Sequence, residues 1–252
     1  MNRTVSRALG CALMSALAAT LVITAPVGAT APAGAGPGYH QPRVGSCHVL
    51  TMRDHRALSA PTAAVPCRRR HTSQTLHVRR SAATVDWESD RLFADMFVPC
   101  ARKANRLLGG DRLRAMSAYD LSMYIPSKVE RAHGARWKRC DLVLVGGRTL
   151  QAMPEKLRLG AARPADRYAR CLAGPDKRLV VTVCAKAHTY RVTGAVRLGG
   201  KKYPGEQRLR AAALDRCPDL VTSRTWRYQT FADPSYWRAG WRSVVCYSKT
   251  KA

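Results

Sequence analysis

The spacing of the cysteines constrains the fold of this chain more than any other sequence feature. Of nine cysteines in 252 residues, Cys11 lies near the start and the other eight form two sets of four. The first set is Cys47, Cys67, Cys100 and Cys140, and the second is Cys171, Cys184, Cys217 and Cys246. The second and third cysteines are 33 positions apart in both sets, because Cys67 precedes Cys100 as Cys184 precedes Cys217.

Other residues repeat with the cysteines. A His-Thr pair follows the second cysteine of each set, beginning at His71 and at His188. A Pro-Ser pair and then a glycine precede each fourth cysteine, with Gly134 and Gly240 both six residues ahead of it. Agreement at several points in the same order predicts an internal duplication.

The first residues have the parts of a secretory signal peptide. Arg3 and Arg7 precede the uncharged stretch Ala8–Ala25, and small residues follow as far as Ala35. This order predicts a signal peptide over residues 1–29, cleaved after Ala29 or within the next few residues. The alternative is a retained membrane anchor, but Ala, Thr, Ser and Gly dilute the stretch and no basic stop-transfer cluster follows it. No other segment is apolar enough to span a membrane, so we expect a soluble mature protein that is secreted or held at the cell envelope.

Eight cysteines in an exported chain predict a disulfide framework. A zinc site does not fit, because the sequence has no C-x-x-C pair, and we expect no metal and no cofactor. The repeat predicts bonds within each set between neighbours in sequence, although four cysteines allow three pairings and the sequence alone does not choose among them. The predicted bonds are Cys47–Cys67, Cys100–Cys140, Cys171–Cys184 and Cys217–Cys246.

Periodicity predicts the same strands–helix–strands unit twice. The expected strands are 75–79, 121–125, 137–145, 179–184, 190–198, 226–231 and 242–247. The expected helices are 91–108, interrupted by Pro99, and 206–217, disturbed or ended by Pro218. The fold class is therefore α+β, as two tandem small modules stapled by disulfides. The predicted organisation is a linker at 30–43, module 1 at 44–146, a second linker at 147–166 and module 2 at 167–252.

The charge of the chain favours anionic partners. Lys and Arg number 43 against 16 Asp and Glu, for a formal net charge of +27, and both halves are basic. Such a surface attracts polyanions. The export signal argues against nucleic acid as the partner.

A resemblance to a known family rests on Val44-Gly45-Ser46-Cys47, on Val65-Pro66-Cys67 with His71, and on an ending built from Pro234, Trp237, Gly240, Arg242 and Cys246. With these motifs the sequence resembles the septum-formation family, whose members are exported or membrane-anchored actinobacterial domains, often duplicated. The resemblance covers most of residues 44–246 and implies a link to cell division or the envelope, without catalytic residues to carry over. Two departures stand out. The acidic residue that commonly follows the family's histidine is missing after His71 and His188, and the first copy has Trp137 after Gly134 instead of a Trp before it.

No catalytic motif is present: the sequence has neither a G-x-S-x-G nucleophile motif nor a phosphate-binding glycine loop. His71 and His188 are candidates for partner binding, metal binding or general-base chemistry. The alternative is that each imidazole bonds to the backbone and fixes the turn after a disulfide. We favour this structural role.

Basic and aromatic residues are the remaining binding candidates. The run Arg68, Arg69 and Arg70 is either solvated surface or a contact to an anionic polymer. Near the C-terminus Trp237 and Trp241 alternate with Arg238 and Arg242, a pattern typical of a core or of a face that stacks on a ligand. The expected function is non-enzymatic, with an anionic wall polymer or an acidic divisome or envelope protein as partner. A secreted cell-wall-acting enzyme with unidentified catalytic residues is the alternative.

Overall fold

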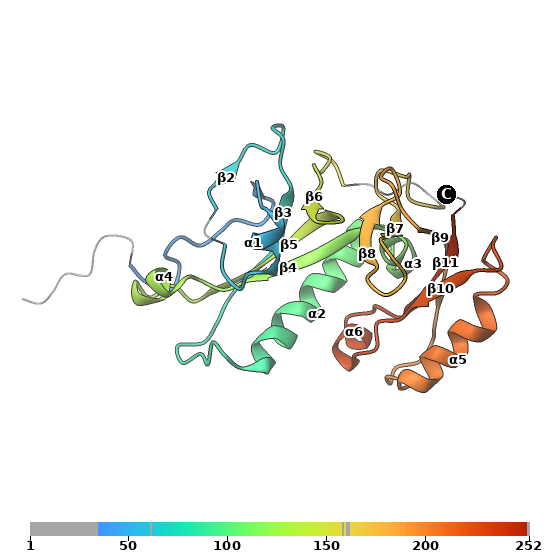
Figure 1. Cartoon of the computed structure of the whole chain (residues 1–252). Helices are drawn as coiled ribbons and strands as arrows, with labels where there is room; N and C mark the ends of the chain where they lie inside the picture. The colour runs from blue at the N-terminus through green and yellow to red at the C-terminus, as the bar shows by residue number, and fades with distance from the viewer. Residues whose placement is uncertain (1–34, 61, 158, 160–161, 251–252) are drawn as a thin grey trace, which may run out of the picture. The chain divides into compact units, whose positions relative to one another are not determined.

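The computed structural model describes residues 35–250, except 61, 158, 160 and 161 (Figure 1). The predicted signal peptide, residues 1–29, lies outside the described residues, and so do residues 30–34 of the predicted linker at 30–43. Among the residues described, none of the helices has the length and apolar character that crossing a membrane requires.

Each half of the described chain forms one antiparallel sheet. The first half contributes β1 (Cys47–His48), β2 (Ala64–Val65), β3 (Ser73–Arg80), β4 (Tyr119–Tyr124), β5 (Trp137–Gly146) and β6 (Thr149–Leu150). The second contributes β7 (Arg170–Ala173), β8 (Val180–Val183), β9 (Tyr190–Arg197), β10 (Trp226–Gln229) and β11 (Ser243–Lys249). The strand orders are β2-β1-β3-β5-β4 with β6 beside β5, and β10-β11-β9-β7-β8.

The two orders are the same when β1 to β5 are matched with β7, β8, β9, β10 and β11 in sequence order. Six helices lie between the strands of the described residues: α1 (Met52–Arg56), α2 (Asp90–Leu107), α3 (Asp111–Ala115), α4 (Lys128–Ala132), α5 (Glu206–Arg216) and α6 (Pro234–Arg238). The disulfide-stapled α+β class is thus confirmed. The shared strand order supports the internal duplication, which stays a prediction.

All four predicted disulfides are confirmed. They join Cys47 to Cys67, Cys100 to Cys140, Cys171 to Cys184 and Cys217 to Cys246. In the first half the second bond ties α2 to β5, and in the second half it ties the C-cap of α5 to β11. Each helix is therefore covalently fixed to the sheet of its own half.

The interruption predicted at Pro99 is wrong, because α2 continues through this residue. Proline removes one backbone donor from a helix, but tertiary contacts fix the helix on both sides of it. Phe97 and Ala101 are buried, and Cys100 is bonded to Cys140. Figure 1 shows α2 running along the sheet that contains β4 and β5. Burial and the covalent bond thus outweigh the local preference of the sequence.

One apolar cluster draws on both halves. It contains Leu142 of β5 and Phe97 of α2, and it also contains Val183 of β8 and Trp241 before β11. Phe97 meets the Trp241 ring edge-on at 5.1 Å between centroids. The segment predicted as a linker, 147–166, carries β6 and buries Met153. The two halves therefore share a core.

Candidate functional site

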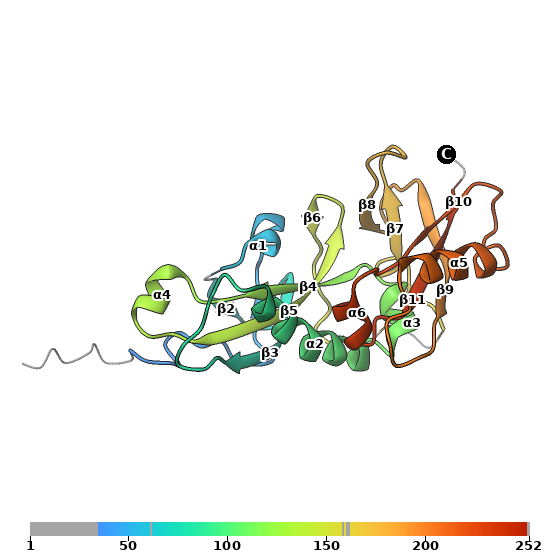
Figure 2. The same ribbon diagram turned by 90° about the horizontal axis from the view of Figure 1, so that it is seen from below.

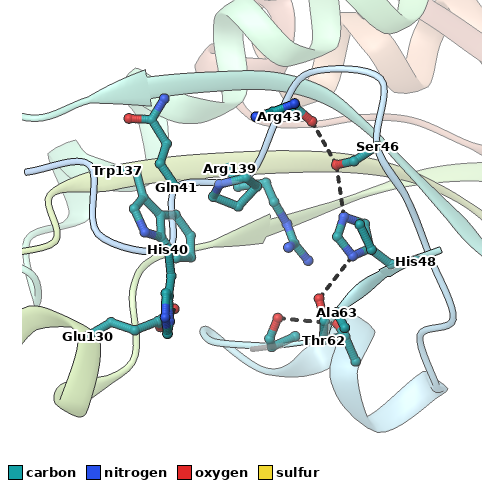
Figure 3. Close-up of a pocket in the computed structure, with 13 residues that line it drawn as sticks. His40, Gln41, Arg43, Ser46, His48, Thr62, Ala63, Glu130, Trp137 and Arg139 are labelled. Atoms are coloured by element: carbon teal, nitrogen blue, oxygen red, sulfur yellow. Dashed lines mark hydrogen bonds and ion pairs between the residues drawn. The ribbon is translucent and has the colours of Figure 1, made fainter. Parts of the chain in front are cut away.

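A pocket of about 530 Å³ opens between the loop that precedes β1 and the strands β1, β2 and β5 (Figure 3). The loop supplies His40, Gln41, Arg43 and Ser46. His48 comes from β1, while Trp137 and Arg139 come from β5. The Trp137 indole donates a hydrogen bond to the Tyr39 carbonyl at 2.9 Å, which holds the loop against the sheet.

Arg139 is the charged group at the base of this pocket. It lies on β5, which is buried along its whole length between β3 and β4, and its side chain is 2% exposed. Its Nε lies 3.1 Å from Oδ1 of Asp141, and its Cζ lies 4.7 Å from the centre of the Tyr124 ring. Among the described residues, neither Nε nor Nη2 has a hydrogen-bond acceptor in suitable geometry. The contact with Asp141 is therefore an ion pair without an aligned hydrogen bond, and the guanidinium keeps unused donors.

The carboxylate of Asp141 is hydrogen-bonded by side chains of a neighbouring strand. It is fully buried and accepts hydrogen bonds from Thr75 Oγ1 at 2.8 Å and from Ser73 Oγ at 3.2 Å. Burial raises the pKa of Asp141, and the charge of Arg139 opposes this rise. Its oxygens are committed to β3, so Asp141 balances the charge of Arg139 without accepting an aligned hydrogen bond from its Nε or Nη2.

His48 is held as a neutral imidazole beside Arg139. Its Nδ1 lies 3.0 Å from the Thr62 carbonyl, which can only accept, so Nδ1 carries the proton and donates. Its Nε2 is then the unprotonated nitrogen, 3.1 Å from the Ser46 hydroxyl oxygen and 3.3 Å from the Thr75 hydroxyl oxygen. Burial lowers the pKa of His48, and Arg139 lowers it further against the opposing charge of Asp141. The base of the pocket thus carries a positive guanidinium next to an uncharged histidine.

Glu130 is the acidic residue in the wall of this pocket, and it has structural partners. Its Oε2 accepts from the Ser127 backbone N–H at 2.7 Å, as part of the capping box that begins α4. Its Oε1 lies 3.6 Å from Nδ1 of His40. Since Oε2 is used in the capping box and Oε1 faces His40, Glu130 forms part of the pocket wall.

A second buried arginine, Arg114, differs from Arg139 in its surroundings. It pairs with Asp111 at 2.9 Å, and its Cζ lies 3.7 Å from the centre of the Trp241 ring. Although its Nε and Nη1 also lack acceptors, Arg114 lies against aromatic rings and is not among the described residues that line this pocket. Its role is to join the two halves.

The two histidines of the repeat occupy equivalent positions. Nδ1 of His71 lies 2.9 Å from the Arg69 carbonyl, and Nδ1 of His188 lies 2.7 Å from the Lys186 carbonyl. Each ring therefore bonds to the backbone two residues before it, in the turn that follows Cys67 or Cys184. This geometry favours the structural role. In the described residues no group of three or more His, Cys, Asp or Glu side chains is placed to hold a metal ion.

The other predicted binding residues separate into surface and core. Arg68, Arg69 and Arg70 are exposed in the turn after β2, and Arg238 is exposed at the end of α6. In contrast, Trp237 and Trp241 are 1% and 4% exposed. Arg242 donates through Nε to the Trp237 carbonyl at 3.2 Å and through Nη1 to the Gly200 carbonyl at 2.8 Å. The tryptophans belong to the core, and their arginine neighbour holds the adjoining loops.

Sequence reasoning missed the residues of the pocket, above all His48, Arg139 and Asp141. A signal for the latter two was present: they stand two positions apart in a strand of Leu, Val and Trp, and so share one face of it. Charged side chains in the middle of a buried strand are rare unless they are paired. His48 gave no such signal, because only the pairing of β1 with β3 and the position of Thr62 bring it to the site.

Comparison with known proteins identifies the family of this chain. The sequence model of the septum-formation family, described as "Septum formation", matches residues 44–246, and the chain belongs to this family. No curated protein and no solved structure matches it. The family suggests a septum-related function in the cell envelope, and four disulfides are consistent with a location outside the cytoplasm.

Proposed function

We propose that this chain is an exported, envelope-associated protein that has no catalytic activity and acts in septation by binding an acidic group of the envelope. The observation that carries this proposal is Arg139, a buried guanidinium with unused donors that lines a pocket open to solvent. The septum-formation family supplies the context, and the net charge of +27 supplies long-range attraction to anionic material.

The energetics of Arg139 favour a ligand. A buried donor without an acceptor costs about 1–3 kcal/mol, and more when the group is charged. Buried polar groups in native proteins are nearly always satisfied, so an exception calls for an explanation. A carboxylate or phosphate oxygen entering the pocket would meet the part of the Arg139 side chain that lines it and form the short, charge-assisted bonds that arginine makes with such groups. An oxyanion is therefore the ligand class that this site fits.

The experiment compares Arg139→Lys with Arg114→Lys in the full mature protein. Both substitutions keep the positive charge and remove the planar fork of a buried arginine paired with an aspartate, but only Arg139 lines the pocket. Binding to isolated envelope fractions is measured by pull-down and sedimentation at low and high salt. We expect Arg139→Lys to weaken binding by at least about tenfold, since a hydrogen bond to a charged group contributes about 1.5–3 kcal/mol. Arg114→Lys should bind as the wild type does.

Thermal unfolding of each variant verifies that it is folded. If both variants are folded and lose binding to the same extent, the pocket is not the binding site. Binding of equal strength at low and high salt would contradict an electrostatic mechanism, because salt screens such interactions.

One observation favours the alternative of a secreted wall-acting enzyme. Ser46 Oγ lies 3.1 Å from Nε2 of His48, whose Nδ1 is oriented by the Thr62 carbonyl, and this order of groups resembles an activated nucleophile and its base. However, the Ser46 hydroxyl donates to the Arg43 carbonyl at the shorter distance of 2.7 Å, which directs its proton away from the histidine. We therefore place Ser46 and His48 in the wall of a binding pocket.

A fluorophosphonate probe tests the enzymatic alternative, because it labels serines that a neighbouring base activates. We expect no labelling of the wild type. Labelling that disappears in both Ser46→Ala and His48→Ala would instead establish a nucleophile at this site.

A further inference from the structure

A second concave surface lies between two hairpins, one from each half of the chain. The turn that links β5 to β6 forms one side, and the turn that links β7 to β8 forms the other, around a cleft of about 840 Å³. Figure 2 shows both hairpins extending on the same side of the sheets. The backbone N–H of Gly147 donates to the Val181 carbonyl at 2.9 Å, so the first hairpin is fixed to β8.

The charged side chains that line this cleft are all cationic. Arg148 comes from the first turn, Arg178 from the second, and Lys186 from the segment after β8. Neither arginine forms an ion pair with any described residue. The carboxylate nearest in sequence, Asp176, accepts from the Tyr190 hydroxyl at 2.7 Å and pairs with Arg227 at 3.4 Å, outside the cleft. The positive charge of the cleft is therefore not neutralised by the described residues.

Local contacts hold Lys186 in place. Nζ of Lys186 donates to the Gly146 carbonyl at 3.2 Å and to the Thr149 hydroxyl at 3.3 Å, and so ties the second half to the β5–β6 turn. An ammonium group has three donors, and two of those of Lys186 are thus used within the protein. The third donor, together with the guanidinium groups of Arg148 and Arg178, remains for a ligand.

Glycines, which have no side chains, are among the residues that line the cleft. Gly147 and Gly174 line it with φ of +78° and +108°, a left-handed conformation that only glycine adopts without strain. In the absence of side chains at these two positions, a ligand can approach the backbone closely. The cleft therefore combines access to its backbone with positive charge.

We propose that this cleft binds a segment of a phosphate-bearing polymer, with successive phosphates on Arg148, Lys186 and Arg178. The proposal rests on the function proposed above and names both a second contact surface and the class of its ligand. A concave cleft with open ends admits a flexible chain, whereas a flat lipid surface would reach only the exposed arginines at its rim. An acidic protein partner is less suited, because protein interfaces depend on aromatic anchors and no aromatic side chain is among the described residues that line the cleft.

The test is a titration with a labelled poly(glycerol phosphate) chain, using the full mature protein. The variant Arg148→Gln/Arg178→Gln removes two cleft charges. Its matched control, Arg208→Gln/Arg210→Gln, removes two charges from the exposed face of α5 and lowers the net charge equally. We expect the cleft variant to bind about tenfold more weakly than the control. The slope of log affinity against log salt should fall by about 1.4, or about 0.7 for each lost phosphate contact, as in flexible single-stranded polyanions.

Equal weakening by the two variants would show that net charge alone is responsible and would overturn the cleft. Polyglutamate of equal charge binding as tightly as the phosphate chain, or anionic phosphatidylglycerol vesicles binding more tightly, would overturn the choice of ligand. The two proposals fail separately. A wild type that binds no anionic envelope material at low salt contradicts the proposed function, whereas binding that depends on Arg139 but not on Arg148 and Arg178 contradicts only the cleft.

Discussion

The Ser243 hydroxyl donates a hydrogen bond of 2.7 Å to the Asp111 carboxylate, across 132 positions of sequence. Asp111 begins α3 in the first half, and Ser243 begins β11 in the second. The same carboxylate oxygen accepts from the backbone N–H of Arg242 at 2.9 Å, while the other oxygen pairs with Arg114. One buried aspartate thus satisfies groups from both halves of the chain.

Replacing Asp111 with alanine should destabilise the protein by about 3–5 kcal/mol, because the substitution leaves the buried Arg114 charge without a partner. The matched control is Asp166→Ala. Asp166 pairs with Arg191, but both side chains are at least two-fifths exposed, so the loss should be below about 1 kcal/mol. Urea unfolding with the disulfides intact measures both values. Similar losses in the two variants would contradict the buried role of Asp111.

The disulfides should contribute unequally to stability. The Cys100–Cys140 bond closes a loop of 40 residues and the Cys171–Cys184 bond one of 13. Chain-entropy estimates give about 4 and about 3 kcal/mol for loops of these lengths. The double variants Cys100→Ala/Cys140→Ala and Cys171→Ala/Cys184→Ala should therefore unfold at different denaturant concentrations, the former at the lower one. The reverse order would show that loop length does not determine the effect.

His48 should make stability depend on pH in mildly acid solution. Because its folded-state pKa lies below the ordinary value of 6.5, the unfolded chain binds more protons than the folded one as the pH falls through this range. Stability is therefore fully present above pH 6.5 and declines below it. His48→Gln removes this proton uptake, so between pH 6.5 and 5 its unfolding free energy should fall less steeply than that of the wild type. Parallel slopes would contradict the burial of a neutral imidazole.

Export predicts a processed N-terminus. N-terminal sequencing of the protein recovered from culture medium or envelope fractions should begin after Ala29 or within the next few residues, since a signal peptide is removed at small residues. A chain that still begins at Met1 in the membrane fraction would support the retained anchor instead.

The sequence by itself determined the longer elements and the grouping of the cysteines into two sets. Strand alternation located β8 and β9, and the apolar face of 206–217 located α5, because these patterns follow from backbone geometry within a few neighbouring residues. The repetition of the cysteines predicted that each disulfide stays within its own set of four, and the structure chose among the three pairings that each set allows. These inferences need no knowledge of distant contacts.

Tertiary structure alone decided the site. Arg139 and His48 are 91 positions apart and meet because β3 pairs with both β1 and β5. The continuation of α2 through Pro99 and the burial of Trp237 and Trp241 depend in the same way on what packs against them. Whether a charged or aromatic side chain is enclosed depends on its partners across the fold, and a local pattern such as the spacing of Arg139 and Asp141 does not identify those partners.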